Sequence, residues 1–413
     1  MKSKVEIMSP VGSYESLMAA IKAKADSIYF GISKLNMRAK SAKSFDLIDL
    51  KKISGICKKN NVKSYLALNT LMYDEDMPLM KKICNAAKKA EITALIIADV
   101  SAMMYANEIG MEVHVSTQAN VSNFEAVKFY SRFADVIVLA RELNLGQIKK
   151  IVDKVKKEKI KGPGGNLLQI ELFAHGAMCV SISGKCYMSL STYNFSANRG
   201  ECLQNCRRAY KVTDIETGKE LVIDNKYVMS PKDMCTISFI DKIMDTGVIV
   251  LKIEGRGRSP EYVYTVTKCY REAATAYLNK EYTKEKIALW LTELKTVYNR
   301  GFWDGYYLGE KMDMWAKDYG TKATKKKEYV GKALNYFKKN KVAQFYLEAG
   351  SIKEKDEIII TGPTTGVIKS TVNSLFADKT AKKTANKGQM ITFKMDELVR
   401  KNDKLYVVKK NSL

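Results

Sequence analysis

Apolar runs rich in β-branched residues alternate with amphipathic helical stretches up to about residue 310. This alternation is typical of buried parallel strands that are connected by crossover helices. Seven or eight such units favour an α/β fold of the (β/α)8 type, a TIM-like barrel, over an open doubly wound sheet. Strands are predicted at 5–10, 26–32, 62–70, 94–99, 112–118, 135–140, 168–176, 227–231 and 248–255, and helices at 13–25, 47–60, 76–90 and 260–278.

The pattern changes after residue 310. Residues 316–327 are polar and basic, as in a linker. Beyond them, short apolar runs are joined by Gly, Pro, Asp and Asn turns, which predicts a small β-barrel. The sequence therefore predicts a barrel domain over 1–315 with a cysteine-rich insertion at 175–235, a basic linker over 316–327, and a small C-terminal all-β barrel over 328–413.

Charge points to a polyanionic partner. The formal net charge is +24, from 69 Lys+Arg against 45 Asp+Glu. Such an excess favours association with nucleic acid, and a merely solvated Lys-rich surface is the alternative. The sequence contains neither an apolar run long enough for a membrane span nor a signal peptide. We therefore expect a cytoplasmic protein without membrane association, whose thiols stay reduced. The oligomeric state is not predicted.

The insertion concentrates cysteines. It holds Cys179, Cys186, Cys202, Cys206 and Cys235, five of the eight in the chain. Thiolates in such number suit zinc or a [4Fe–4S] cluster, because both are bound tetrahedrally by soft ligands. A zinc knuckle would need a second close pair besides Cys202 and Cys206, whereas scattered cysteines on loops fit a cluster in the barrel mouth. The other three cysteines lie on apolar helical faces and are predicted to be core residues: Cys57, Cys84 and Cys269.

Polar residues also follow the predicted strands, where a barrel places its functional groups. Arg141, Lys252 and Arg256 are candidates to bind a carboxylate or phosphate. His175 and Glu171 are candidates to orient a cluster ligand or to transfer protons, and a structural role is the alternative. A Cys179–His175 nucleophilic pair is also conceivable from their proximity in sequence. The strand-end set is Asn69, Asp99, Ser116, Gln118, Asn120, Arg141, Glu142, Glu171, His175, Lys252, Glu254 and Arg256.

The insertion resembles the signature of the U32 family, historically labelled peptidases or collagenases. Further matches lie at 36–39, 116–123, 139–145, 229–235, 252–256, 299–309 and 360–366, so the resemblance spans nearly the whole chain. The signature itself is met by Glu171, Phe173, His175 to Ala177, Cys179, Ser183, Gly184, Cys186, Ser189, Asn198, Gly200, Cys202, Cys206 and Arg207.

Length and C-terminal region are most similar to the branch of the family that hydroxylates wobble uridine 34 of tRNA to 5-hydroxyuridine without molecular oxygen. The resemblance implies tRNA as substrate and prephenate, a small carboxylic acid, as co-substrate. It also implies a [4Fe–4S] cluster bound by Cys179, Cys186, Cys202 and Cys235, with Cys206 as an extra thiol. Whether Cys206 replaces Cys235 stays open at this point.

The peptidase label attaches to the same signature, so a peptidase or collagenase that hydrolyses peptide bonds is the alternative function. A protease needs a nucleophile with its base, or a metal with an open coordination position. The spacing of the sequence shows neither. A chain with a net charge of +24 also fits an RNA substrate better than a protein.

Overall fold

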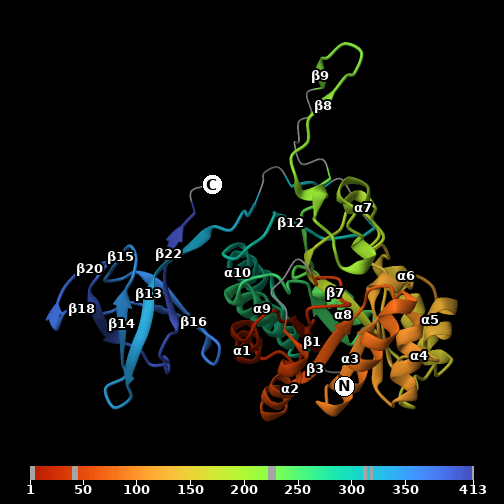
Figure 1. The fold of residues 1–413 in the computed structure, drawn as a ribbon, viewed down its shortest axis with the longest axis horizontal. Helices are drawn as coiled ribbons and strands as arrows, with labels where there is room; N and C mark the ends of the chain where they lie inside the picture. Colours follow the sequence, from red (N-terminus) through yellow and green to blue (C-terminus); the bar gives the residue numbers. More distant parts are fainter. Residues whose placement is uncertain (1–4, 40–44, 222–228, 310–313, 317–319, 412–413) are drawn as a thin grey trace.

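Eight parallel strands close into a barrel that forms the larger part of the molecule (Figure 1). The computed structural model describes residues 5–39, 45–221, 229–309, 314–316 and 320–411. The strands follow one another around the ring in chain order, and the last one pairs with both β7 and β1. The predicted (β/α)8-type barrel is therefore confirmed. Its strands are β1 (Glu6–Pro10), β2 (Ser27–Phe30), β3 (Lys63–Leu68), β4 (Ala94–Ile97), β5 (Glu112–Val115), β6 (Val136–Val138), β7 (Gln169–Ala177) and β11 (Val250–Ile253).

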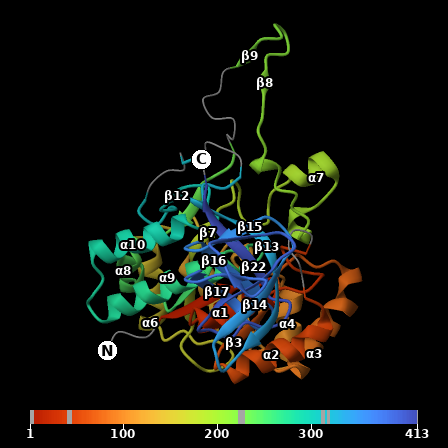
Figure 2. The same cartoon turned by 90° about the vertical axis from the view of Figure 1, so that its left-hand side faces the viewer.

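Helices surround the barrel (Figure 2), and their buried apolar residues belong to its core. The buried residues Ile148, Ile151, Val152 and Val155 of α6 recur at the spacing of one helical face. Side chains such as Asn144 cap the helix starts and accept a backbone hydrogen bond there. These helices are α1 (Tyr14–Lys22), α2 (Leu50–Lys59), α3 (Met77–Lys89), α4 (Val100–Glu108), α5 (Phe124–Tyr130), α6 (Leu145–Lys157), α8 (Ile240–Asp245), α9 (Pro260–Leu278) and α10 (Lys284–Lys295).

One predicted strand is misplaced. The strand expected at 227–231 includes residues 227 and 228, which lie outside the described residues, and residues 229–231 form no strand. The nearest strand is β10 (Asp233–Cys235), which runs antiparallel to β7 and parallel to β12 (Phe302–Trp303). Pro231 has no N–H to donate to a ladder, and it forms only an isolated antiparallel bridge with Trp315. β10 is an addition beside β7, and it is not a member of the closed ring.

The insertion lies above the carboxyl end of the barrel strands (Figure 1). Between β7 and β10, its described residues form α7 (Met188–Tyr193), two single 3-10 turns and the hairpin of β8 (Val212–Thr213) and β9 (Glu220–Leu221). The hairpin projects away from the body of the molecule. Hydrogen bonds fasten the insertion to the barrel loops: Gln118 Nε2 donates to Ser183 Oγ at 3.1 Å, and Leu71 N donates to Asn198 O at 3.1 Å.

The C-terminal region is antiparallel and all-β, as predicted, and has an apolar core of its own. β13 begins at Lys325, inside the range predicted as a linker, and the domain boundaries at 315 and 327 stay a prediction. The strands are β13 (Lys325–Phe337), β14 (Val342–Leu347), β15 (Ser351–Lys353), β16 (Glu357–Gly362), β17 (Gly366–Thr371), β18 (Phe376–Ala377), β19 (Thr380–Ala381), β20 (Thr384–Asn386), β21 (Met390–Lys394) and β22 (Lys404–Lys410).

The C-terminal region packs on the barrel helices through β16 and β17. Ile359 and Val367 join the apolar core of the barrel. Gly366 has φ +70°, and a Cβ there would lie 2.9 Å from the backbone of α1, so only glycine permits this approach. Ion pairs flank the contact, with Lys22 Nζ 2.7 Å from Glu397 and Lys327 Nζ 2.8 Å from Glu261.

None of the described helices is long and apolar enough to cross a membrane.

Candidate active-site cavity

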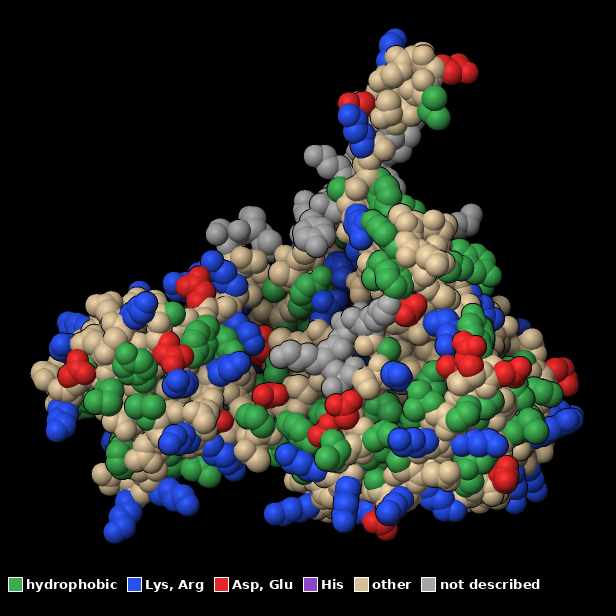
Figure 3. Space-filling view, viewed as in Figure 1, with side chains coloured by type: hydrophobic (Ala, Val, Ile, Leu, Met, Phe, Trp, Pro, Cys, Tyr) green, Lys and Arg blue, Asp and Glu red, His purple; other side chains and the backbone are tan. Residues whose placement is uncertain are grey.

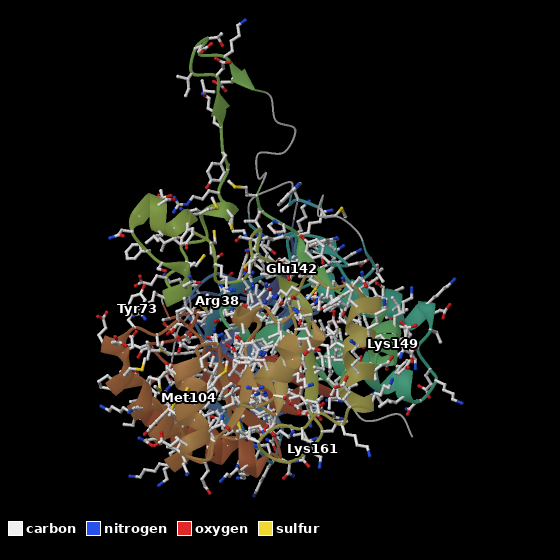
Figure 4. All side chains as sticks on the ribbon, turned by 90° about the vertical axis from the view of Figure 1, so that its right-hand side faces the viewer. Arg38, Tyr73, Met104, Glu142, Lys149 and Lys161 are labelled. Carbon is white, nitrogen blue, oxygen red and sulfur yellow. The ribbon has the colours of Figure 1, made fainter. Side chains whose placement is uncertain are left out.

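A cavity of about 290 Å³ opens at the carboxyl end of the barrel, beneath the insertion. Figure 3 shows Lys and Arg side chains inside the hollow at the barrel mouth. Figure 4 shows Arg38 and Glu142 at this end of the barrel and Lys161 at the opposite end. Among the described lining residues Glu254 is the single carboxylate, whereas seven are cations: Arg38, Arg141, Arg207, Lys252, Arg256, Arg258 and Arg300.

Glu254 organises one side of this cavity. Its Oε1 accepts from Arg38 Nη2 at 2.7 Å, and its Oε2 accepts from the hydroxyl of Tyr29 at 3.0 Å. Burial by itself would raise the pKa of Glu254, but Arg38, Arg256 and Arg141 lower it to about 2. Glu254 is therefore ionised at neutral pH and neutralises only part of the surrounding positive charge.

The three predicted cations all line the cavity, as part of what we call the cation wall: Arg38, Arg141, Lys252 and Arg256. Arg141 Nη1 donates to Ala177 O at 3.1 Å, and its guanidinium lies 3.9 Å from the ring centre of Phe173. Arg256 Nη1 donates to Asn36 Oδ1 at 3.0 Å. The Nε atoms of Arg141 and Arg256 are buried without a described partner. Both side chains also line the cavity, where guanidinium groups can bind an anionic ligand.

Uncharged polar groups complete the barrel side of the cavity. Asn69 Nδ2 lies 3.2 Å from both Ser116 Oγ and Gln118 Oε1, and Asn69 Oδ1 accepts from Met37 N at 3.2 Å. Because Gln118 also donates to Ser183, this network joins the strand ends to the insertion. Fixed amide and hydroxyl groups of this kind can orient a small polar ligand.

Four cysteines of the insertion form the opposite side, which we call the thiol wall: Cys179, Cys186, Cys202 and Cys206. Burial raises the pKa of the Cys206 thiol, Arg207 lowers it, and the other three thiols raise it, so each of the other three lies within electrostatic reach of Cys206. Cys179 also interacts with the charges of Arg38 and Arg207. Guanidinium groups therefore lie close to the thiols of this wall.

Arg207 links the thiol wall to the strand β10 region. Its Nη1 donates to Ser230 Oγ at 3.0 Å and to Pro231 O at 2.7 Å, and its Nη2 donates to Met178 O. The side chain therefore bridges both ends of the insertion. Arg207 lies within electrostatic reach of both Cys179 and Cys206. It belongs to the family signature, but it was not predicted from the sequence to be a functional residue.

Cys235 and His175 lie behind this cavity and do not line it. Cys235 is 3% exposed, burial raises its thiol pKa to about 12, and Tyr270 donates to its Sγ at 3.9 Å. His175 is 2% exposed, and its Nδ1 lies 3.3 Å from the Tyr270 hydroxyl. Burial lowers the pKa of His175 to about 4, so its ring is neutral at neutral pH. The structure does not bring His175 and Cys179 together as a nucleophilic pair on the cavity surface.

The remaining strand-end residues divide by position. Glu171 is fully buried inside the barrel, where its Oε1 accepts from Lys252 Nζ at 2.8 Å. Asp99 caps α4 and accepts from Met72 N. Asn120 and Glu142 line an adjacent recess.

Three cations of the cavity were not predicted from the sequence: Arg38, Arg258 and Arg300. They follow no predicted strand directly, although the stretches 36–39 and 299–309, which match the family, contain two of them.

Among the described residues, no group of three or more His, Cys, Asp or Glu side chains is already arranged to hold a metal ion. The donor chemistry nevertheless fits an iron–sulfur cluster: four thiols line one cavity, and cations compensate the negative charge of thiolates. Cys57, Cys84 and Cys269 are buried in the helical layer, which confirms the prediction that they are core residues.

Comparison with known proteins defines the family. The model of Peptidase family U32 matches residues 12–317, more than half of the chain. The chain belongs to peptidase family U32. It is 58% identical over 401 residues to a protein of Porphyromonas gingivalis (strain W83) named collagenase, and the match covers 97% of each chain. The family resemblance seen in the sequence is thus confirmed.

Other relatives carry RNA-modifying names. Identity is 29% with tRNA hydroxylation protein P1 of Bacillus subtilis (strain 168), over 96% of this chain and 93% of that protein. It is 30% with the 23S rRNA 5-hydroxycytidine C2501 synthase of Escherichia coli (strain K12), over 76% of this chain and 47% of that protein. The solved structure of the U32 peptidase Mk0906 matches with a TM-score of 0.40 at 12% identity, covering 62% of this chain and 94% of that chain. The U32 family thus includes proteins named for peptide cleavage and proteins named for RNA hydroxylation.

Proposed function

We propose that this U32 protein modifies tRNA by hydroxylating wobble uridine 34 to 5-hydroxyuridine without molecular oxygen. The observation that carries the proposal is one cavity with thiols on one side and a surplus of cations on the other. This combination suits a cofactor held by thiolates together with anionic ligands, and the described lining residues include no His that could pair with a cysteine as the base of a nucleophilic peptidase. The relatives named for tRNA and rRNA hydroxylation support the same reaction class.

Cys179, Cys186 and Cys202 would hold a [4Fe–4S] cluster, as the resemblance implies. Cys206 is the fourth thiolate that the described contacts favour, because it shares the thiol wall, whereas Cys235 is shielded behind Tyr270. The assignment of Cys235 as the fourth ligand, which the family resemblance implies, stays a prediction. Separate substitutions of Cys206 and Cys235 distinguish the two possibilities. When bound, the cluster would supply electron transfer in the cavity.

The cation wall would bind a small carboxylic acid, prephenate in the branch that this chain resembles. Arg141 and Arg256 line the cavity, and Phe173 and Tyr29 offer aromatic surface beside Arg141 and Lys252. A carboxylate in this position gains charge-assisted hydrogen bonds in a partly desolvated site. Asn69, Ser116 and Gln118 would orient the polar groups of the acid or of the uracil ring.

The RNA would approach from the barrel mouth. An unpaired base must be turned out of its strand to bring a ring carbon into a cavity of this kind. The net charge of +24 would attract phosphates, so tRNA affinity should fall steeply as salt rises. Electrophoretic mobility shifts between 50 and 300 mM salt test this, with a short acidic peptide as the competitor that should fail to displace tRNA.

Peptide hydrolysis is the second candidate, because the 58% identical protein of Porphyromonas gingivalis is named collagenase. Two assays on the same purified protein discriminate between the candidates. Mass spectrometry of tRNA nucleosides should show 5-hydroxyuridine that depends on Arg256, while collagen and casein should remain intact. Collagen cleavage that is lost in Cys179→Ala, together with unmodified tRNA, would establish the peptidase.

A further inference from the structure

A chain of ionisable side chains runs through the barrel below the cavity. It begins at Lys252, which lines the cavity, and continues to Glu171, whose Oε1 is 2.8 Å from Lys252 Nζ. Glu171 Oε2 lies 3.9 Å from His114 Nδ1, and His114 Nε2 lies 3.0 Å from Glu112 Oε1. The first three side chains are at most 5% exposed, whereas the side chain of Glu112 is 41% exposed.

The chain connects opposite ends of the barrel. Lys252 comes near the end of β11 and opens into the cavity, whereas Glu112 is the first residue of β5 and reaches solvent at the amino end. The surrounding interior is largely apolar, since Met8, Tyr29, Tyr65, Ala94 and Ile96 pack into one cluster there. A barrel interior is normally filled by bulky apolar side chains. Four ionisable groups in a row through it need a functional explanation.

The two atoms that face each other at the centre of this chain have no hydrogen-bond partner. His114 Nδ1 and Glu171 Oε2 are both buried and unsatisfied in the described structure. A buried imidazole nitrogen and a buried carboxylate oxygen are destabilising when unpaired, and a shared proton satisfies both once a side-chain movement closes the 3.9 Å between them. Because His114 Nε2 contacts Glu112 at the same time, a proton gained at Nδ1 allows one to leave from Nε2.

We propose that Lys252, Glu171, His114 and Glu112 form a proton pathway between the cavity and the solvent at the amino end of the barrel. The Lys252 ammonium gives a proton to Glu171, and Glu171 passes it to His114 Nδ1. His114 releases the proton on Nε2 to Glu112, which gives it to water, and the neutral Lys252 amine takes up a proton from the cavity. Each group gains and loses one proton, and the net charge of the chain returns to its starting value.

Such a pathway is useful when the cavity mouth is covered. The need for such a pathway rests on the proposed function. In that function the bound RNA closes the cavity mouth while a C–H bond of the uracil ring is replaced, and the released proton must leave the cavity. Other ionisable groups lie beside the pathway and have partners outside it. Tyr65 packs on His114, with ring centres 4.5 Å apart. The Tyr65 hydroxyl donates to Glu6, and Glu6 pairs with Lys63. Asp135 lies within electrostatic reach of Glu112 and His114.

Glu112→Gln provides the sharpest test, because it changes an exposed residue far from the cavity and keeps a hydrogen-bonding side chain. The chain contains two histidines, so 15N-histidine labelling gives two imidazole signals that His175→Gln assigns. In the full-length protein, hydrogen exchange of the His114 ring N–H with water should slow at least about tenfold in Glu112→Gln. Glu91→Gln, an exposed carboxylate before β4, is the matched control and should leave exchange unchanged.

Catalysis supplies the second readout. With tRNA in excess, Glu112→Gln and Glu171→Gln should lower the modification rate at least about tenfold without changing the KM for tRNA, and Glu91→Gln should not. Unchanged His114 exchange in Glu112→Gln, or a full modification rate in it, would overturn the pathway. If the wild-type protein modifies no tRNA, the proposed function fails, and the exchange measurement still decides the pathway.

Discussion

The cation wall and the thiol wall face the same cavity but are built differently. The cation wall stands on barrel strands and the loops next to them, where Arg38, Arg256 and Lys252 each have a described hydrogen bond to another buried or half-buried side chain. On the thiol wall, Cys179, Cys186 and Cys202 lie outside helices and strands, and no described group of three is arranged to hold a metal. The barrel thus presets its charges, whereas the thiols need a ligand to bring them together.

This difference separates two kinds of failure. Loss of a thiol should remove the cofactor and leave the barrel folded, because the insertion lies outside the closed ring. Loss of a cation should remove the reaction and leave the cofactor bound.

Removal of a thiol has the largest expected effect. Cys179→Ala, Cys186→Ala and Cys202→Ala should each lose nearly all of the about four irons per chain and the brown colour after anaerobic purification. Far-ultraviolet circular dichroism should stay that of the wild type. Cys57→Ala and Cys84→Ala are the controls, because both thiols are buried in the helical layer and should leave the iron content unchanged.

A paired comparison identifies the fourth ligand. Cys206→Ala should lose the cluster, because Cys206 lies on the thiol wall, whereas Cys235→Ala should keep it. Iron analysis and the visible spectrum decide between them. The reverse outcome would show that β10 shifts when the cluster binds and that the family assignment of Cys235 is right.

Loss of a cation should stop the reaction with the cluster still in place. Arg256→Gln and Arg141→Gln should each lower tRNA modification by about 100-fold or more, the scale of a removed anion-stabilising group. The visible spectrum should not change. Arg132→Gln, an exposed arginine before β6, is the control for the loss of one positive charge. A colourless Arg256→Gln protein would mean that the two walls are not separable.

Arg207 joins the two ends of the insertion, so its loss should have an intermediate effect. Arg207→Gln removes three described hydrogen bonds and should destabilise the insertion locally by about 1–3 kcal/mol. Hydrogen–deuterium exchange should increase over residues 178–208 and remain unchanged in the barrel strands. Arg208→Gln changes the exposed neighbouring arginine and should give the wild-type pattern.

His175 should have the smallest effect at neutral pH, because its contribution to stability changes only in acid. Burial lowers its pKa to about 4 from 6.5, so the unfolded chain binds the proton more readily than the folded one. The free energy of unfolding should therefore fall as pH decreases from 6.5 to 4, by about 3 kcal/mol from this group, and be unaffected above pH 6.5. Urea unfolding of wild type and His175→Gln checks this. Equal pH slopes in the two proteins would show that His175 titrates normally.

The barrel was accessible from the sequence because its strands are buried on both faces and appear as unbroken apolar runs. The predicted strands 5–10 and 94–99 correspond to Glu6–Pro10 and Ala94–Ile97. β13 was missed, because its outer face is solvated and its lysines, which suggested a linker, pair with Glu357, Glu328 and Glu261. Periodicity detects a strand only where burial requires apolar residues.

The site was predictable only in part. Arg141, Lys252 and Arg256 follow strand ends, so the barrel geometry alone placed them at the mouth. Which of Cys206 and Cys235 lines the cavity depends on how the insertion folds back over the barrel. The spacing of the cysteines in the sequence does not determine this. The link from Glu171 to His114 depends on side chains of β5 and β7 that meet across the barrel interior. Such contacts arise from closure of the ring and have no signature in the local sequence.

The central claim is that the two walls together serve tRNA hydroxylation. Mass spectrometry of tRNA nucleosides from a deletion strain, complemented with wild-type protein, Cys186→Ala or Arg256→Gln, tests it most directly. We predict that 5-hydroxyuridine and its derivatives at position 34 disappear on deletion, return with the wild-type protein, and stay absent with either variant. An unchanged nucleoside profile in the deletion strain, with no second copy of the gene present, would contradict the account.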